Sequence, residues 1–245
     1  MFLPLAFLLM GSVTTNMLQV VARKNVDVGG GGLSQDSEIG TTTPCTSCTE
    51  IESDVLSMGT ITNGIVVGIV AVESGTAPTF TSVQFGTDES EEYTLNVTHS
   101  LTGINGELNI YIFTDEIGSE SSGSKVLEVI VTEAKSEMWC WVGVYNGGDQ
   151  TPSYTTATDA AAYQTTSNIT TNKPDGDIAL GIHGFFGDVS TALTTTDTEE
   201  EAYNNSGGMG VIVTSISAGD GSVTLDGSYT GDKWGGGVAI VIPAN

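Results

Sequence analysis

The chain has 245 residues, and 30 acidic residues against 6 basic ones give it a formal charge of −24 at pH 7. A negative field of this size repels phosphate backbones, so no nucleic-acid partner is expected. The length suits one all-β domain, because β-sandwiches often run to about 200–250 residues as a single unit.

The first segment of the chain is apolar. Its large side chains are Phe2, Leu3, Leu5, Phe7, Leu8 and Leu9, and residues 1–16 contain no Lys or Arg. The apolar run is shorter than the roughly 20 residues that cross a bilayer, and it lacks the positive start of a secretory signal. An apolar segment requires burial. Residues 1–16 are therefore predicted to be an assembly contact; the alternative is that they fill the core of their own domain.

The next segment predicts one strand and then a loop. Residues 17–22 (MLQVVA) are the predicted first strand, and the glycine run at 29–32 with its Ser/Thr-rich continuation predicts a flexible loop over residues 27–50. Cys45 and Cys48 lie in this loop, far from Cys140. A local Cys45–Cys48 disulfide or two free thiols is favoured over zinc or redox chemistry, because neither a second CxxC nor a helix start accompanies the pair.

From residue 64 onwards, β-branched and aromatic runs alternate with clusters of Gly, Asn, Asp, Ser and Thr. Several runs have a period of two, so that one face can lie in a core and the other in water. The pattern predicts an all-β fold, a single antiparallel β-sandwich or jelly roll over residues 17–245 with an apolar N-terminal extension. The runs are residues 64–72, 80–85, 107–113, 126–132, 138–145, 177–186, 210–216, 222–226 and 237–242.

Residues that often mark binding or catalytic sites are assigned to structural roles. Trp139 and Trp141 are two apart, so they share one face of a strand. We expect them in the core rather than in a sugar-stacking platform. His183, within IALGIHGFF, is expected to be a hydrogen-bonded strand residue, and His99 a surface residue. The chain has no nucleophile elbow, P-loop or zinc-protease motif, so no enzyme activity is predicted.

Carboxylate-rich loops are the candidates for an ion site. Asp175 and Asp177 flank a glycine, and such a turn can aim two oxygen ligands at one Ca²⁺ ion. The chain has no EF-hand loop and no nonapeptide calcium repeat, so solvated surface charge is the favoured interpretation. Apart from Ca²⁺ at these two residues, the sequence predicts no cofactor.

Several segments, in their order along the chain, resemble a β-sandwich module of phage structural proteins and bacterial secreted or surface proteins. The resemblance covers residues 17–245, and residues 1–16 have no counterpart in the module. It implies a jelly-roll-like display or assembly module with no catalytic residues to carry over. The segments are NGIVVGIVAV (63–72), PTFTSVQFG (78–86), ELNIYIF (107–113), WVGVYNGGDQTP (141–152), DGDIAL (175–180) and KWGGGVAIVIP (233–243).

The sequence and the resemblance together predict a non-enzymatic structural subunit of a virion, such as a phage capsid decoration, fibre or tail protein. Its expected partners are copies of itself and other structural proteins of the assembly, with surface glycans as a further candidate; no membrane span is expected. Two alternatives remain open. One is a subunit of an extracellular, pilus-like filament on a cell surface, which a short extended arm can join by strand addition. The other is a carbohydrate-binding adhesin module.

Overall fold

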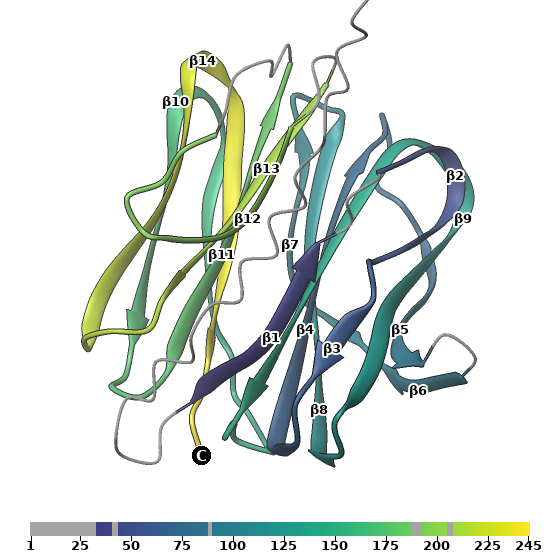
Figure 1. Cartoon of the computed structure of the whole chain (residues 1–245). Coiled ribbons are helices and arrows are strands. Elements are labelled where there is room, and N and C mark those ends of the chain that lie inside the picture. The colour runs from purple at the N-terminus through teal and green to yellow at the C-terminus, as the bar shows by residue number, and fades with distance from the viewer. Residues whose placement is uncertain (1–32, 41–43, 88–89, 188–192, 205–207) are drawn as a thin grey trace, which may run out of the picture.

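The structure, a computed structural model, describes residues 33–40, 44–87, 90–187, 193–204 and 208–245. These residues form fourteen strands and no helix, so the predicted all-β class is confirmed (Figure 1). They contain no helix long and apolar enough to cross a bilayer. The strands are β1 (Ser34–Gly40), β2 (Cys45–Glu52), β3 (Leu56–Met58), β4 (Ile61–Glu73), β5 (Phe80–Thr87), β6 (Ser90–Thr94), β7 (Asn96–Ile104), β8 (Leu108–Glu120), β9 (Gly123–Asn146), β10 (Thr155–Lys173), β11 (Ile178–Phe186), β12 (Thr198–Asn204), β13 (Met209–Ile216) and β14 (Gly221–Ile242).

The strands form two antiparallel sheets that pack face to face, which confirms the predicted sandwich. The larger sheet has the order β6-β5-β9-β4-β8-β7, and β1, β2 and β3 also pair with β9. The smaller sheet has the order β10-β14-β11-β13-β12 and lies beside the larger one (Figure 1). Apolar side chains of β4, β8 and β9 meet those of β11, β13 and β14 and form the core between the sheets, here called the central core. The predicted strand at 17–22 lies outside the described residues.

Strand β4 is buried on both faces. Ile65, Val67 and Ile69 point into the central core, whereas Val66 and Val70 point into a second core on the opposite side. None of the five side chains is exposed. The sequence of β4 is accordingly a continuous apolar run rather than an alternation, as expected for a strand without a water-facing side. The expectation of one face in water does not apply to this strand.

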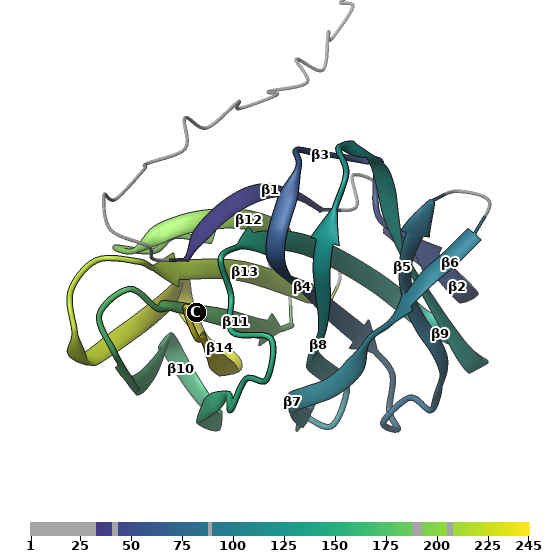
Figure 2. The same ribbon diagram turned by 90° about the horizontal axis from the view of Figure 1, so that it is seen from below.

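The second core exists because β9 is long and the larger sheet curls around it. Residues 126–131 of β9 pair with β5, whereas residues 137–145 pair with β4. Side chains from both parts, such as Val129 and Val142, meet in the second core. The curl is visible around β4, β8, β9 and β5 (Figure 2). The predicted separate strands at 126–132 and 138–145 are thus two parts of one strand, and their separation was wrong.

Strand β14 likewise joins two predicted strands and folds back over the outer face of the smaller sheet. Gly237, in its second part, pairs with His183 of β11, whereas Gly227, in its first part, lies against the side chain of the same histidine. A Cβ atom at position 227 would lie 2.7 Å from the His183 Cβ, so the close approach requires glycine. Small apolar clusters around Leu225 and Tyr229 lie beneath this fold.

Seven strands, most of them polar, were not predicted; they are β1, β2, β3, β6, β7, β10 and β12. Strands β1 and β2 occupy residues 34–40 and 45–52, so the prediction of a flexible loop over 27–50 was wrong at residues 34–40 and 45–50. Both strands pair with β9. The Thr-rich β10 pairs with β14 along almost its whole length. Backbone hydrogen bonds to a long neighbouring strand order these segments, and such bonds do not require an apolar pattern.

The prediction that Trp139 and Trp141 lie in the core is confirmed. Their side chains are 1% and 0% exposed and belong to the central core. Met138 and Cys140 point to the opposite face of β9 and are buried in the second core. This part of β9 therefore resembles β4 in having no face in water.

Trp141→Ala is expected to lower the free energy of unfolding by about 3–5 kcal/mol, because it removes a buried indole and leaves a cavity between the sheets. Trp234→Ala is the matched control, since Trp234 is 39% exposed; its effect should be clearly smaller. Chemical denaturation measures both changes. Equal losses in the two variants would contradict the assignment of Trp141 to the core.

Candidate functional site

Large apolar side chains are scarce on the described surface. The six residues predicted as an assembly contact, Phe2, Leu3, Leu5, Phe7, Leu8 and Leu9, lie outside the described residues. Within the described ranges the exposed large apolar side chains are Val55, Val97, Tyr163 and Trp234. Tyr163 and Trp234 are adjacent, with ring centroids 6.2 Å apart. No sequence pattern distinguished this pair, because it comes from strands about 70 residues apart in the chain.

Cys45 and Cys48 are joined by a disulfide. They lie in strand β2 rather than in a loop, and Ser47 between them has a positive φ of 55°. Cys45 pairs with Met138 of β9 and Cys48 with Lys135, after which the register of the two strands shifts. The disulfide therefore closes a distorted turn of backbone at the point where β2 passes from one part of β9 to the other.

Asp175 and Asp177 bind backbone groups. Asp175 Oδ1 accepts a hydrogen bond from the Gly176 N–H at 3.1 Å, and Asp177 Oδ1 accepts one from the Ala244 N–H at 3.0 Å. Asp177 is buried, whereas Asp175 is exposed. Lys173 Nζ donates to the Asp177 carbonyl oxygen at 2.9 Å. The two carboxylates thus fasten the β10–β11 turn and the C-terminal residues.

A different group of carboxylates converges on the larger sheet. Glu50 and Glu52 of β2 and Glu128 of β9 have ligand oxygens within 4.8 Å of one another. Glu52 is the direct partner of Glu128 across the two strands. Three carboxylates are a donor set of the kind that Ca²⁺ accepts, although exposed acidic groups of this kind are common without an ion. The sequence did not predict the group, because it depends on the pairing of β2 with β9.

His183 is enclosed in the smaller sheet, as expected of a hydrogen-bonded strand residue. Its Nδ1 lies 3.0 Å from Ser167 Oγ and its Nε2 lies 3.2 Å from Thr214 Oγ1. Burial lowers the pKa of His183 to about 3, against a weaker opposing effect of Asp226. The ring is therefore neutral at ordinary pH, with both nitrogens in hydrogen bonds. His99, nearer the surface, contacts Thr158 Oγ1 through Nε2 at 2.7 Å.

Two neighbouring carboxylates lie at the junction of the sheets. Glu73 of β4 and Glu137 of β9 are direct cross-strand partners, and Glu137 is buried. The Tyr203 hydroxyl of β12 donates to Glu137 Oε1, and its ring stacks on Trp139. Burial raises the pKa of Glu73, and repulsion by Glu137 and then Glu107 raises it further. Like charges that face each other across a strand pair destabilise a sheet.

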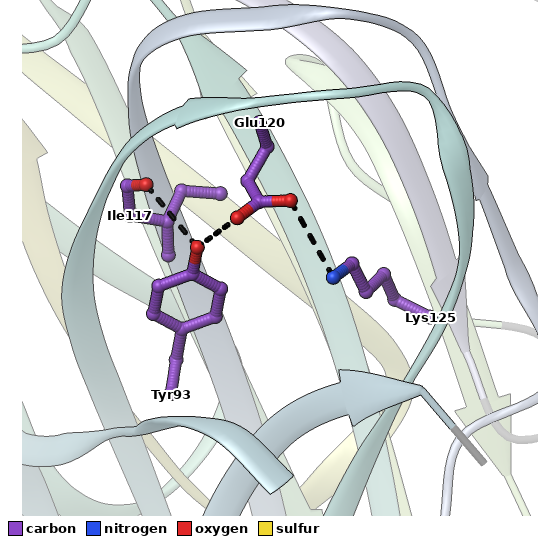
Figure 3. A network of polar contacts seen from close by, with 4 residues as sticks. All are labelled: Tyr93, Ile117, Glu120 and Lys125. Carbon is purple, nitrogen blue, oxygen red and sulfur yellow. Dashed lines mark hydrogen bonds and ion pairs between the residues drawn. The ribbon is translucent and has the colours of Figure 1, made fainter. Parts of the chain in front are cut away.

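A polar network fastens the edge of the larger sheet (Figure 3). The Tyr93 hydroxyl of β6 donates to the Glu120 carboxylate of β8, and Lys125 Nζ of β9 lies 3.5 Å from Glu120 Oε2. The same ammonium group lies 5.9 Å from the centroid of the Tyr93 ring. A buried lysine needs such compensation. The network thus links three strands and fixes the short strand β6.

No protein-family model, no curated protein and no solved structure matches the chain. The assignment of a function therefore depends on the chemistry of the described residues and on the sequence itself.

Glu73→Gln should flatten the pH dependence of stability. The folded-state pKa of Glu73 is raised above its ordinary value of 4.5, so its favourable contribution is complete below about pH 4.5 and is lost as pH rises through the folded-state pKa. The variant should gain stability over the parent at neutral pH and lose that advantage in acid. Urea denaturation at several pH values measures this, with exposed Glu133→Gln as control. An unchanged pH profile would contradict the expectation.

His183→Gln should reduce the loss of stability on acidification. The pKa of His183 is lowered from 6.5 to about 3, so its contribution is present above pH 6.5 and is lost as pH falls towards 3. The parent should lose up to about 1.4 kcal/mol of stability per pH unit in this range through this group. The variant should lack this part of the slope, measured by the same denaturation series. His99→Gln is the control, and an equal flattening in that variant would contradict the assignment.

Proposed function

We propose that the chain is a non-enzymatic structural subunit of a virion, of the kind that decorates a phage capsid or forms part of a fibre or tail. The observation that carries the proposal is the contrast between the described surface and the first ten residues. The described ranges expose only four large apolar side chains. Residues 1–10 contain six Phe and Leu side chains: Phe2, Leu3, Leu5, Phe7, Leu8 and Leu9. An apolar contact that holds the subunit in an assembly therefore belongs to residues 1–16.

The interior of the domain supports a scaffold role. Strand β4 and the second part of β9 are buried on both faces, so the sheets form a block with two apolar cores. Groups that acid–base catalysis often uses are held within the fold: both ring nitrogens of His183 contact hydroxyls, and Glu137 accepts from Tyr203. The resemblance to a display module of phage structural proteins agrees with this interpretation.

Replacement of the six large apolar residues among residues 2–9 by serine should abolish assembly and leave the β-sandwich folded, because the sandwich has its own cores. Sedimentation velocity should show large species for the full chain and monomer for the variant, with unchanged far-UV circular dichroism. Ser12→Ala, Thr14→Ala and Thr15→Ala together form the matched control, which alters the same segment without removing apolar side chains. Assembly of the serine variant at the parental level would overturn the assembly role of this segment.

The virion assignment has its own test. An antibody against the purified domain should label virus particles from the source at regular positions in immunogold electron micrographs. Labelling along filaments on cells would instead support the cell-surface alternative. The absence of label on particles would overturn the virion assignment whatever the sedimentation result.

A further inference from the structure

Tyr163 and Trp234 form an exposed aromatic pair on the smaller sheet. They are direct partners in β10 and β14, and their ring planes are inclined by 67°. Their side chains are 64% and 39% exposed. Val55 and Val97, the other exposed large apolar residues in the described ranges, lie elsewhere as single side chains. Tyr and Trp combine a flat apolar face with a polar group, which makes an exposed pair suited to binding.

The pair is mounted on the rim of the central core. Trp234 pairs with Phe186 of β11, and Phe186 pairs with Met209 of β13. Met209 is buried in the central core, and the partly buried Phe186 packs against it. A row of large side chains therefore crosses four strands, from fully buried at Met209 to exposed at Tyr163. The buried end of this row holds in place the strands that carry Tyr163 and Trp234.

Strand β10 is distorted on both sides of Tyr163. Its register with β14 shifts between Asp159 and Ala162 and again just after Gln164. Gln164 Nε2 donates to Asp159 Oδ2 at 2.9 Å and to the Gly235 carbonyl oxygen at 3.1 Å. Such irregularities re-aim side chains and are frequent beside functional sites. Because hydrogen bonds hold the distortion, the exposed ring is preorganised and loses little freedom on binding.

The chemistry around the pair favours a neutral, hydroxyl-rich ligand. The net charge of −24 disfavours anionic ligands. The one acidic residue of β10 is Asp159, and its Oδ2 already accepts hydrogen bonds from Gln164 and from the Asn168 N–H. Hydroxyl and amide groups can donate to and accept from sugar hydroxyls. The exposed polar residue of β10 that is two positions from Tyr163, Thr165, is of this kind.

We propose that Tyr163 and Trp234 form a binding site for a neutral saccharide. The apolar face of a sugar ring lies against the aromatic rings, and the hydroxyls of the sugar contact polar side chains of β10 beside Tyr163, such as Thr165. The site goes beyond the assembly role and does not depend on it, since it lies on the sandwich domain and not in residues 1–16. It also differs from a platform at Trp139 and Trp141, which are buried.

The test uses the full chain on an array of neutral oligosaccharides containing glucans, mannans, galactans and chitin oligomers, followed by calorimetry with the best binder. Tyr163→Ala and Trp234→Ala should each weaken binding about tenfold or more. Trp234→Phe should retain most of the affinity. Of the three tryptophans in the chain, Trp139 and Trp141 are buried, so a shift of tryptophan emission on binding should come from Trp234 and vanish in Trp234→Phe.

Val97→Ala is the matched control, because it removes an exposed apolar side chain from β7 and should leave binding unchanged. The absence of binding to every neutral saccharide on the array would overturn the proposal, as would full affinity in the Tyr163→Ala and Trp234→Ala variants. Trp234-dependent binding of tetramethylammonium or of a sulfated oligosaccharide in place of neutral saccharides would assign the site to a charged ligand and overturn it too. None of these outcomes alters the sedimentation test of residues 1–16.

Discussion

Strand β4 has no side in water, and the other strands are arranged to cover both of its faces. Burial of each Val or Ile side chain contributes about 1.5–3 kcal/mol, so the continuous apolar run of β4 is a major source of stability. The smaller sheet covers one face of β4, and the curled part of the larger sheet covers the other. Covering the second face requires that β9 is long enough to pair first with β4 and then with β5.

Basic residues in the described ranges mainly contact other groups of the same domain. Lys125 pairs with Glu120, Lys173 donates to backbone carbonyls, and Lys233 lies over the ring of Tyr229. Because the chain has 30 acidic and 6 basic residues, most of its negative charge has no basic counter-charge. In the proposed assembly, the negative field of the surface would act between neighbouring subunits, within a Debye length of about 8 Å at physiological ionic strength. Contacts between subunits of the proposed assembly would therefore need an apolar contribution strong enough to offset this repulsion.

The local sequence pattern predicts the burial of Trp139 and Trp141, whereas long-range strand pairing determines the exposure of Trp234. Trp139 and Trp141 stand at a spacing of two within an apolar strand, and that spacing was enough to predict a shared buried face. Trp234 also stands in a glycine-rich, β-prone segment, yet it is exposed beside Tyr163. Its exposure depends on where the register of β10 and β14 shifts. Register shifts between distant strands leave no local signal in a single sequence.

The short apolar runs and the turn residues between them determined the all-β class and the antiparallel sandwich, because short β-branched runs bounded by turn residues, without helical spacing, are typical of strands that pack in sheets. They also determined the core position of Trp139 and Trp141. Only the tertiary structure decided that 126–132 and 138–145 form one strand and that the polar segments of β1, β2 and β10 are ordered. It alone brought Glu50 and Glu52 to Glu128 and Tyr163 to Trp234. These outcomes depend on backbone pairing with β9 and β14, which satisfies hydrogen bonds whatever the side chains are.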